Sequence, residues 1–120
     1  MSTDIVLIDD NEIHLQTIGR ILQNYGFSVA TLSNPVQSLK ILPDIHPRII
    51  VLDIMMPGMD GFHLLKSIKE LPDFQDIPII ILSGKQFAPD KRKALSLGAK
   101  EYLTKPVNSR DLISEIKKYL

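Results

Sequence analysis

The stretch that decides the fold is Arg48-Ile-Ile-Val-Leu-Asp53-Ile-Met-Met-Pro-Gly-Met-Asp-Gly61. Four consecutive apolar residues, 49–52, lead into the single carboxylate of Asp53. Such a run is typical of a strand that is buried on both faces, the usual state of a central parallel strand. Residues 55–58 then predict a turn. Asp53 is therefore either a cap for this turn or a functional carboxylate at the carboxyl end of a sheet, where open α/β folds place their sites.

The composition predicts one domain over residues 1–120, large enough to fold without disulfides or a structural metal. The absence of cysteine excludes disulfide scaffolds, zinc–thiolate sites and cysteine nucleophiles. A formal net charge of zero gives no argument for nucleic-acid or membrane binding. The apolar runs are too short to cross a bilayer, and no signal-peptide pattern is visible. We therefore expect a soluble, cytoplasmic protein that binds neither membrane nor nucleic acid directly.

Five strand–helix units follow one another along the chain. Strands are predicted at 5–8, 27–32, 49–52, 77–82 and 102–103. Helices are predicted around the apolar positions 15, 18, 22 and 25 with a stop at Gly26, from Asn34 to Pro43, over 61–71, over 89–97 and after Asn108. Residues 44–47 read as a turn. The alternation predicts a doubly wound α/β fold: a flavodoxin-like three-layer sandwich with a five-stranded parallel sheet in the order 2-1-3-4-5 and five helices.

Polar residues directly follow four of the apolar strands: Asp9-Asp10, Asp53, Ser83-Gly84 and Lys105-Pro106. Parallel winding brings all four to one edge of the sheet. Neighbouring carboxylates repel one another, and a divalent cation relieves the repulsion. Oxygen ligands favour a hard ion such as Mg²⁺. Asp10, Asp53 and a backbone carbonyl after Asp53 could bind it, with Asp9 binding through water or tuning the site.

An aspartate beside such a metal can act as a nucleophile toward phosphorus. The ammonium group of Lys105 and the hydroxyl group of Ser83 could each contact a phosphoryl oxygen. Gly84 leaves space for the phosphoryl group to enter. The pattern therefore indicates aspartyl-phosphate chemistry at Asp53.

The sequence resembles the receiver domains of two-component response regulators, the CheY-like family, over essentially its whole length. The matching motifs are Leu7-Ile-Asp-Asp10, residues 52–61, Leu82-Ser-Gly84 and Tyr102-Leu-Thr-Lys-Pro106. The resemblance implies that Asp53 accepts a phosphoryl group from a histidine kinase or a histidine phosphotransfer protein. It implies a signalling switch that catalyses only its own phosphotransfer and dephosphorylation.

The resemblance also assigns the other residues of the site. Asp9, Asp10, Asp53 and the backbone carbonyl of Met55 would bind Mg²⁺ or Mn²⁺. Lys105 would contact the phosphoryl group, and its peptide bond to Pro106 is usually cis in the family. Ser83 would be the switch hydroxyl, and Tyr102 the aromatic residue that turns inward when Ser83 moves. The signal would leave through the face of the fourth helix, last strand and fifth helix, to a partner protein or an output domain outside this sequence.

Other functions fit the residues less well. A Rossmann domain requires a glycine-rich turn where Asp9-Asp10-Asn11 stands. An aspartate-nucleophile phosphatase would carry a carboxylate at the position of Met55, and a flavodoxin would not present carboxylates to its phosphate. A docking module whose phosphorylation is vestigial stays open as the alternative. The three histidines, His14, His46 and His63, lie in different predicted elements without ligand spacing, so we do not expect them to bind a metal.

Overall fold

The computed structural model describes residues 3–56, 59–84 and 88–120. Five parallel strands form its main sheet in the order β2-β1-β3-β6-β7. Their bounds are Ile5–Ile8 (β1), Val29–Leu32 (β2), Ile49–Leu52 (β3), Ile79–Ser83 (β6) and Glu101–Thr104 (β7). When only the strands of the main sheet are numbered along the chain, β6 is the fourth and β7 the fifth. The observed order is then 2-1-3-4-5, and the predicted order is confirmed.

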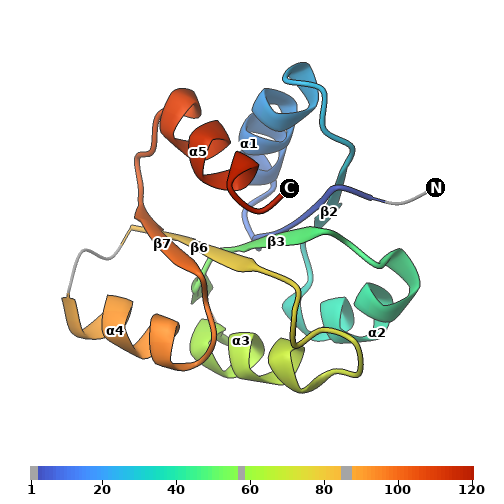
Figure 1. Ribbon diagram of the computed structural model, residues 1–120, viewed down its shortest axis with the longest axis vertical. Coiled ribbons are helices and arrows are strands. Elements are labelled where there is room, and N and C mark those ends of the chain that lie inside the picture. The colour runs from blue at the N-terminus through green and yellow to red at the C-terminus, as the bar shows by residue number, and fades with distance from the viewer. Residues whose placement is uncertain (1–2, 57–58, 85–87) are drawn as a thin grey trace.

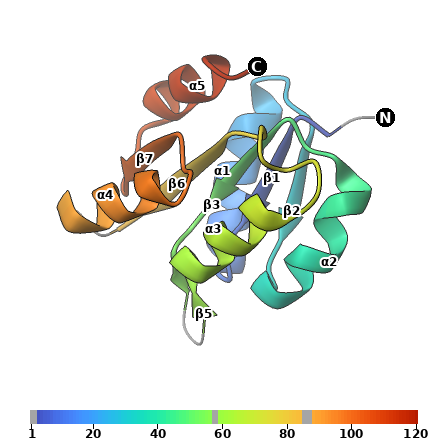
Figure 2. The same ribbon diagram turned by 60° about the horizontal axis from the view of Figure 1, so that its bottom comes forward.

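Helices cover both faces of the sheet (Figures 1 and 2). One face carries α1 (Glu12–Asn24) and α5 (Ser109–Lys117). The other carries α2 (Pro35–Ile45), α3 (Gly61–Glu70) and α4 (Ala88–Ser96). None of the helices within the described ranges combines the length and apolar character needed to span a bilayer. The predicted three-layer sandwich is thus the observed architecture.

The central strand β3 supplies side chains to both cores, because successive residues of a strand point to opposite faces. Ile50 and Leu52 belong to the core under α2, α3 and α4, and Ile49 and Val51 to the core under α1 and α5. All four are fully buried. This explains why the stretch before Asp53 is apolar without interruption.

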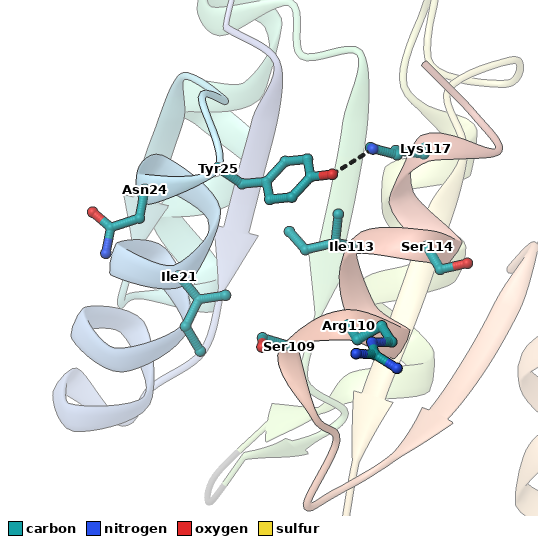
Figure 3. Close-up of a pocket in the computed structure, with 8 residues that line it drawn as sticks. All are labelled: Ile21, Asn24, Tyr25, Ser109, Arg110, Ile113, Ser114 and Lys117. Atoms are coloured by element: carbon teal, nitrogen blue, oxygen red, sulfur yellow. Dashed lines mark hydrogen bonds between the residues drawn. The ribbon is translucent and has the colours of Figure 1, made fainter.

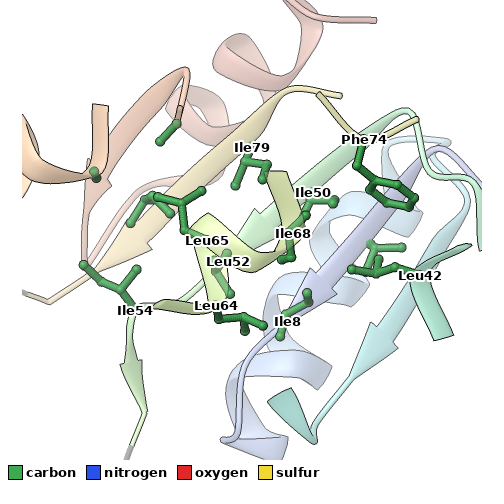
Figure 4. Packing of buried hydrophobic residues seen from close by; sticks show 14 of the residues in the cluster. Ile8, Leu42, Ile50, Leu52, Ile54, Leu64, Leu65, Ile68, Phe74 and Ile79 are labelled. Carbon is green, nitrogen blue, oxygen red and sulfur yellow. The ribbon is translucent and has the colours of Figure 1, made fainter. Parts of the chain in front are cut away.

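The core under α3 is the larger of the two clusters. Figure 4 shows three side chains of α3, those of Leu64, Leu65 and Ile68, lying over the strands. Each is fully buried, and burying a leucine or isoleucine stabilises the fold by roughly 1.5–3 kcal/mol. Phe74, from the loop between α3 and β6, fills the end of this core near Leu42.

Side-chain caps begin the helices where the sequence predicts them. The Asn34 side chain accepts a hydrogen bond from the Gln37 amide (3.1 Å) at the start of α2. The Asn108 side chain accepts one from the Asp111 amide (2.8 Å) at the start of α5. Asp60 caps α3 in the same way. Each cap satisfies a backbone N–H that has no partner within its helix.

The predicted end of the second helix at Pro43 is wrong, as is the predicted turn at 44–47. The helix α2 continues through Pro43 to Ile45 and ends at His46, whose φ of 52° is left-handed. Pro43 lies in the last turn, where its exposed ring disturbs only the preceding turn of a helix that is about to stop. The His46 amide donates to the Leu42 carbonyl (3.2 Å) and closes the helix.

Other boundaries shift by one or two residues. β2 begins at Val29 rather than at residue 27, and β6 at Ile79 rather than at residue 77. The predicted turn at 55–58 is partly strand, because β4 (Met55–Met56) pairs with β5 (Met59–Asp60) in a small antiparallel sheet. Pro57 and Gly58 of that turn lie outside the described residues.

Candidate functional site

Two carboxylates meet at the carboxyl end of the central strands. Asp9 follows β1 and Asp53 follows β3, and these strands pair in register with Ile8 opposite Leu52. The ladder continues past the strand ends, where the Asp53 amide donates to the Ile8 carbonyl (3.0 Å). Strand pairing therefore sets the positions of both carboxylates, and the sequence predicted this edge.

The ammonium group of Lys105 lies between these carboxylates. Its Nζ is 3.1 Å from Asp53 Oδ2 and 3.3 Å from Asp9 Oδ2. Lys105 directly follows β7, and its amide donates to the Ser83 carbonyl at the end of β6 (2.7 Å). The peptide bond between Lys105 and Pro106 is cis. The structure thus brings together Asp9, Asp53 and Lys105 from three strand ends.

The charges of this group do not balance. The side chains of Asp9 and Asp53 are only 3% and 8% exposed, and that of Lys105 is 20% exposed. Two ionised carboxylates against one ammonium leave a formal charge of −1 in a site largely removed from water. Because buried charges are costly unless they are paired, the Lys105 ammonium group offsets part of the cost of burying these carboxylates.

The two residues of the acidic pair point in different directions. Asp9 is buried, and its Oδ1 accepts a hydrogen bond from the Asn11 amide (3.0 Å). Asp10 is exposed. Successive residues at the end of a strand project to opposite sides, so only one of the pair reaches the ammonium of Lys105. Asp10 is open to solvent and is not in the group of ligand atoms formed by Asp9, His14 and Asp53.

His14 is part of the site, contrary to the expectation that none of the three histidines lies near a metal site. Its Nδ1 is 3.1 Å from Asp9 Oδ2 and 3.1 Å from Lys105 Nζ. The side chain of a helical residue leans toward the helix N-terminus, and α1 begins next to Asp9. A first-turn position in the helix that follows an acidic strand end was the signal that could have identified His14.

The donor atoms present fit a divalent cation. One ligand atom each from Asp9, His14 and Asp53 lie within 4.8 Å of one another. Carboxylate oxygens and a neutral imidazole nitrogen are both common metal ligands. Met55, whose carbonyl the resemblance assigns to the metal, begins β4 two residues after Asp53. Bound there, a divalent ion would neutralise the carboxylates and any phosphoryl oxygens beside them.

Ser83 and Tyr102 lie on the same side of the sheet. Ser83 ends β6 and is fully buried, and Tyr102 in β7 is 8% exposed and belongs to the core beneath α4. Tyr102 is paired with Ile81, two residues before Ser83. Because residues two apart share a face, Ser83 and Tyr102 both face the α3 and α4 layer. Gly84 is exposed just beyond Ser83.

A groove of about 700 Å³ lies elsewhere, between α1 and α5 (Figure 3). The Lys117 ammonium group donates to the Tyr25 hydroxyl group across it and also lies over the Tyr25 ring, 4.5 Å from its centre. The groove shares no residue with the group around Lys105. We therefore place the chemistry at the strand ends.

Comparison with known proteins identifies the fold and the family. Residues 5–117 match the model of the response regulator receiver domain. Protein PilG of Pseudomonas aeruginosa is 35% identical over 116 residues, which cover 97% of this chain and 86% of PilG. The regulatory protein VanRc of Enterococcus gallinarum is 35% identical over 120 residues, which cover the whole chain and 51% of VanRc.

Solved structures show the same fold. The chemotaxis protein CheY4 of Vibrio cholerae superimposes with a TM-score of 0.92 over all of both chains, at 24% identity. A CheY-like receiver domain protein from Methanospirillum hungatei gives a TM-score of 0.89 at 27% identity, over 98% of this chain and 93% of that one. The chain spans most of PilG, about half of VanRc and 26% of PleD from Caulobacter vibrioides.

Proposed function

The chain belongs to the receiver domain family of response regulators, and on that premise we propose that it is a signalling switch with Asp53 as its phosphoacceptor. Residues 1–120 would form one such domain. The observation that carries the proposal is the buried carboxylate of Asp53 with the Lys105 ammonium 3.1 Å away and the Asp9 carboxylate beside it. An aspartate that only capped a turn would need neither a buried side chain nor the contact with the Lys105 ammonium group.

In the proposed reaction an Asp53 carboxylate oxygen attacks the phosphorus of a phosphohistidine on a histidine kinase or phosphotransfer protein. A P–O bond forms as the P–N bond breaks, and the bond electrons leave with the imidazole, which takes up a proton. The product is a carboxyl phosphate on Asp53. Hydrolysis of this bond by water returns the switch to its starting state, so the protein acts only on itself.

The neighbouring residues lower the cost of bringing more negative charge to Asp53. Lys105 already lies in hydrogen-bonding reach of Oδ2, and its ammonium group can contact a phosphoryl oxygen when Asp53 is modified. Asp9, Asp10, Asp53 and the Met55 carbonyl would hold Mg²⁺ or Mn²⁺, which when bound neutralises the phosphoryl oxygens. The side chain of Asp10 is exposed and therefore accessible to a hydrated ion.

Phosphorylation would be reported through Ser83 and Tyr102. The Ser83 hydroxyl would hydrogen-bond to a phosphoryl oxygen, and the Tyr102 ring would respond on the same side of the sheet. This coupling would change the face made by α4, β7 and α5, where a downstream protein or an output domain would bind. We place this exchange in the cytoplasm, where histidine kinases would supply the phosphoryl group.

The test is intact-mass measurement after incubation with acetyl phosphate and Mg²⁺. Wild type is expected to gain one phosphoryl group, Asp53→Asn none, and Asp44→Asn, which alters an exposed aspartate of α2, as much as wild type. No gain by wild type would reject the proposal and favour a docking module with vestigial phosphorylation. Equal gain by Asp53→Asn would reject Asp53 as the acceptor.

A further inference from the structure

The groove between α1 and α5 has an apolar floor that is open to solvent (Figure 3). Ile113 of α5 is buried, and Ile21 of α1 is partly buried in the same core. Figure 3 shows the Tyr25 ring pointing from the end of α1 toward α5. Tyr25 is 52% exposed, which is unusual for so large an apolar ring. Covering this surface with apolar side chains of a partner would remove it from water and favour binding.

The charged residues of the groove all have the same sign. Of the described residues that line it, Arg110 and Lys117 carry charge, and both are cationic and exposed. Neither forms a salt bridge within the described part of the chain. The acidic residues of α5 are engaged elsewhere, since Asp111 belongs to the cap of the helix and Glu115 forms an ion pair with Lys118. The groove therefore presents two positive charges that no carboxylate offsets.

Lys117 is held over the groove by Tyr25. Its ammonium group donates to the Tyr25 hydroxyl group and lies 4.5 Å from the centre of the ring. Tyr25 takes one of the three N–H donors of the ammonium group, and a carboxylate of a partner can accept from the others. Because the lysine is already positioned, less side-chain entropy is lost when an ion pair forms there.

The spacing of the two cations matches the repeat of a helix. Arg110 and Lys117 are seven residues apart on α5, or two turns, which is about 10.5 Å along the helix axis. A partner helix lying along α5 has the same repeat, so carboxylates seven positions apart on it would reach both cations. The positions three and four residues along lie on the same face and would place apolar side chains against Ile21 and Ile113.

We propose that the α1–α5 groove binds an acidic amphipathic helix of a partner protein, with its carboxylates on Arg110 and Lys117 and its apolar side chains on the floor between them. A second copy of this chain is a poorer occupant, because a two-fold contact would bring the cationic groove of one copy against that of the other. The groove shares no residue with the group around Asp53, so the inference goes beyond the proposed phosphoacceptor function and does not depend on it.

The test is fluorescence anisotropy with a labelled helical peptide that carries two glutamates seven positions apart and two leucines between them. The wild-type chain should bind this peptide about tenfold or more tighter than a peptide with lysines in place of both glutamates, and Arg110→Glu should lose about tenfold. The matched control is Lys40→Glu, the same charge reversal at an exposed position of α2, which should leave the affinity unchanged. Equal affinity for the two peptides, or unchanged binding by Arg110→Glu, would overturn the proposal.

An exchange of charges keeps the test valid if a variant folds poorly. Arg110→Glu should recover most of the lost affinity for one of the two peptides in which a single glutamate is replaced by lysine, as direct coupling between two positions requires. A misfolded variant would recover affinity for neither, and so would a partner bound elsewhere. In the wild-type complex, the amide resonances of Ile21, Tyr25 and Ile113 should shift on addition of the peptide. Shifts confined to α2, α3 and α4 would refute this site.

Sedimentation velocity of the chain alone separates a protein partner from self-association. We expect a monomer, and Arg110→Glu should sediment as wild type does. A wild-type dimer that Arg110→Glu dissociates would assign the groove to a second copy and overturn the proposal. None of these measurements uses a phosphoryl donor, so a failure of phosphorylation would count only against the proposed function.

Discussion

Lys105 Nζ lies 3.1 Å from Asp53 Oδ2, although 52 residues separate the two in sequence. The same nitrogen is 3.3 Å from Asp9 Oδ2, 96 residues away. One ammonium group therefore holds together the ends of β1, β3 and β7. The contact links the chemistry of the site to the stability of the fold, because both carboxylates are buried.

Lys105→Met should destabilise the metal-free protein. The change leaves two neighbouring buried carboxylates without their cation, and we expect the free energy of unfolding to fall by about 1–3 kcal/mol. Urea denaturation measures this, and added Mg²⁺ should restore part of the loss. The control is Lys118→Met, which removes an exposed ion pair with Glu115 and should not move the midpoint. Equal midpoints for wild type and Lys105→Met would contradict the structural role of the ammonium group.

Gly61→Ala should destabilise the protein and disturb the site. A Cβ at Gly61 would overlap the backbone of Ile54, including its carbonyl oxygen at 2.6 Å, and Ile54 directly follows Asp53. We expect a loss of about 1–3 kcal/mol, as for other overpacked positions, and slower phosphorylation by acetyl phosphate.

A second glycine provides the matched control for this prediction. In Gly19→Ala, within α1, the new Cβ would meet Thr31 Cγ2 at an ordinary 3.6 Å. Alanine is the better helix former, so this variant should gain about 0.5–1 kcal/mol. Thermal denaturation of the two variants should therefore show shifts of opposite sign. Shifts of the same sign would mean that the contact with Ile54 does not dominate at Gly61.

Phe74→Ala should be among the more destabilising single changes. Phe74 lies in a loop, yet only 1% of it is exposed, and it packs at the end of the core near Leu42 (Figure 4). Truncation leaves a cavity and should cost about 3–5 kcal/mol by chemical denaturation. Val36→Ala, at a position 62% exposed on α2, should change stability little. A small effect of Phe74→Ala would show that the loop can collapse into the vacated space.

Tyr119 should titrate late because of Glu101. The Tyr119 hydroxyl group donates to Glu101 Oε1 (2.7 Å), and this hydrogen bond, followed by burial, raises the pKa of Tyr119 to about 12. The folded pKa is above the ordinary value of 10.0, so the stabilisation is fully present below pH 10 and is lost as the pH rises toward 12. Glu101→Gln should move the titration to lower pH. Ultraviolet absorbance of tyrosinate measures the Tyr119 titration in wild type and in Glu101→Gln, with Tyr119→Phe to assign the signal. An unchanged titration midpoint in Glu101→Gln would contradict the hydrogen bond to Glu101 as the cause of the raised pKa.

Much of the fold could be predicted because local patterns and global packing agree. The apolar run 49–52 is long enough for a strand and too uniform for a half-exposed one, and β3 is buried on both faces. The caps at Asn34 and Asn108 are chemical signals that act within three residues. The end of α2 was missed because proline is tolerated when the helix stops within the same turn. The strand pairing of Met55 with Asp60 has no apolar alternation to reveal it.

The site was predicted less completely than the fold. Sequence order predicts that strand ends share an edge, and so it brought Asp9, Asp53 and Lys105 to the same place. It did not predict the position of His14, since side-chain direction depends on where α1 begins relative to β1. The roles of Ser83, Tyr102 and the Met55 carbonyl remain proposals.

The sequence by itself determined the alternation of strands and helices, the parallel order of the sheet and the edge where polar residues collect. These follow from periodicity, chain connectivity and short-range caps. Only the tertiary structure decided which polar atoms meet: that Asp9 faces inward while Asp10 faces solvent, and that the Lys105 ammonium group lies among Asp9, His14 and Asp53. The reason is physical, because a contact of 3 Å depends on strand twist, helix placement and side-chain rotamers, which no local pattern specifies.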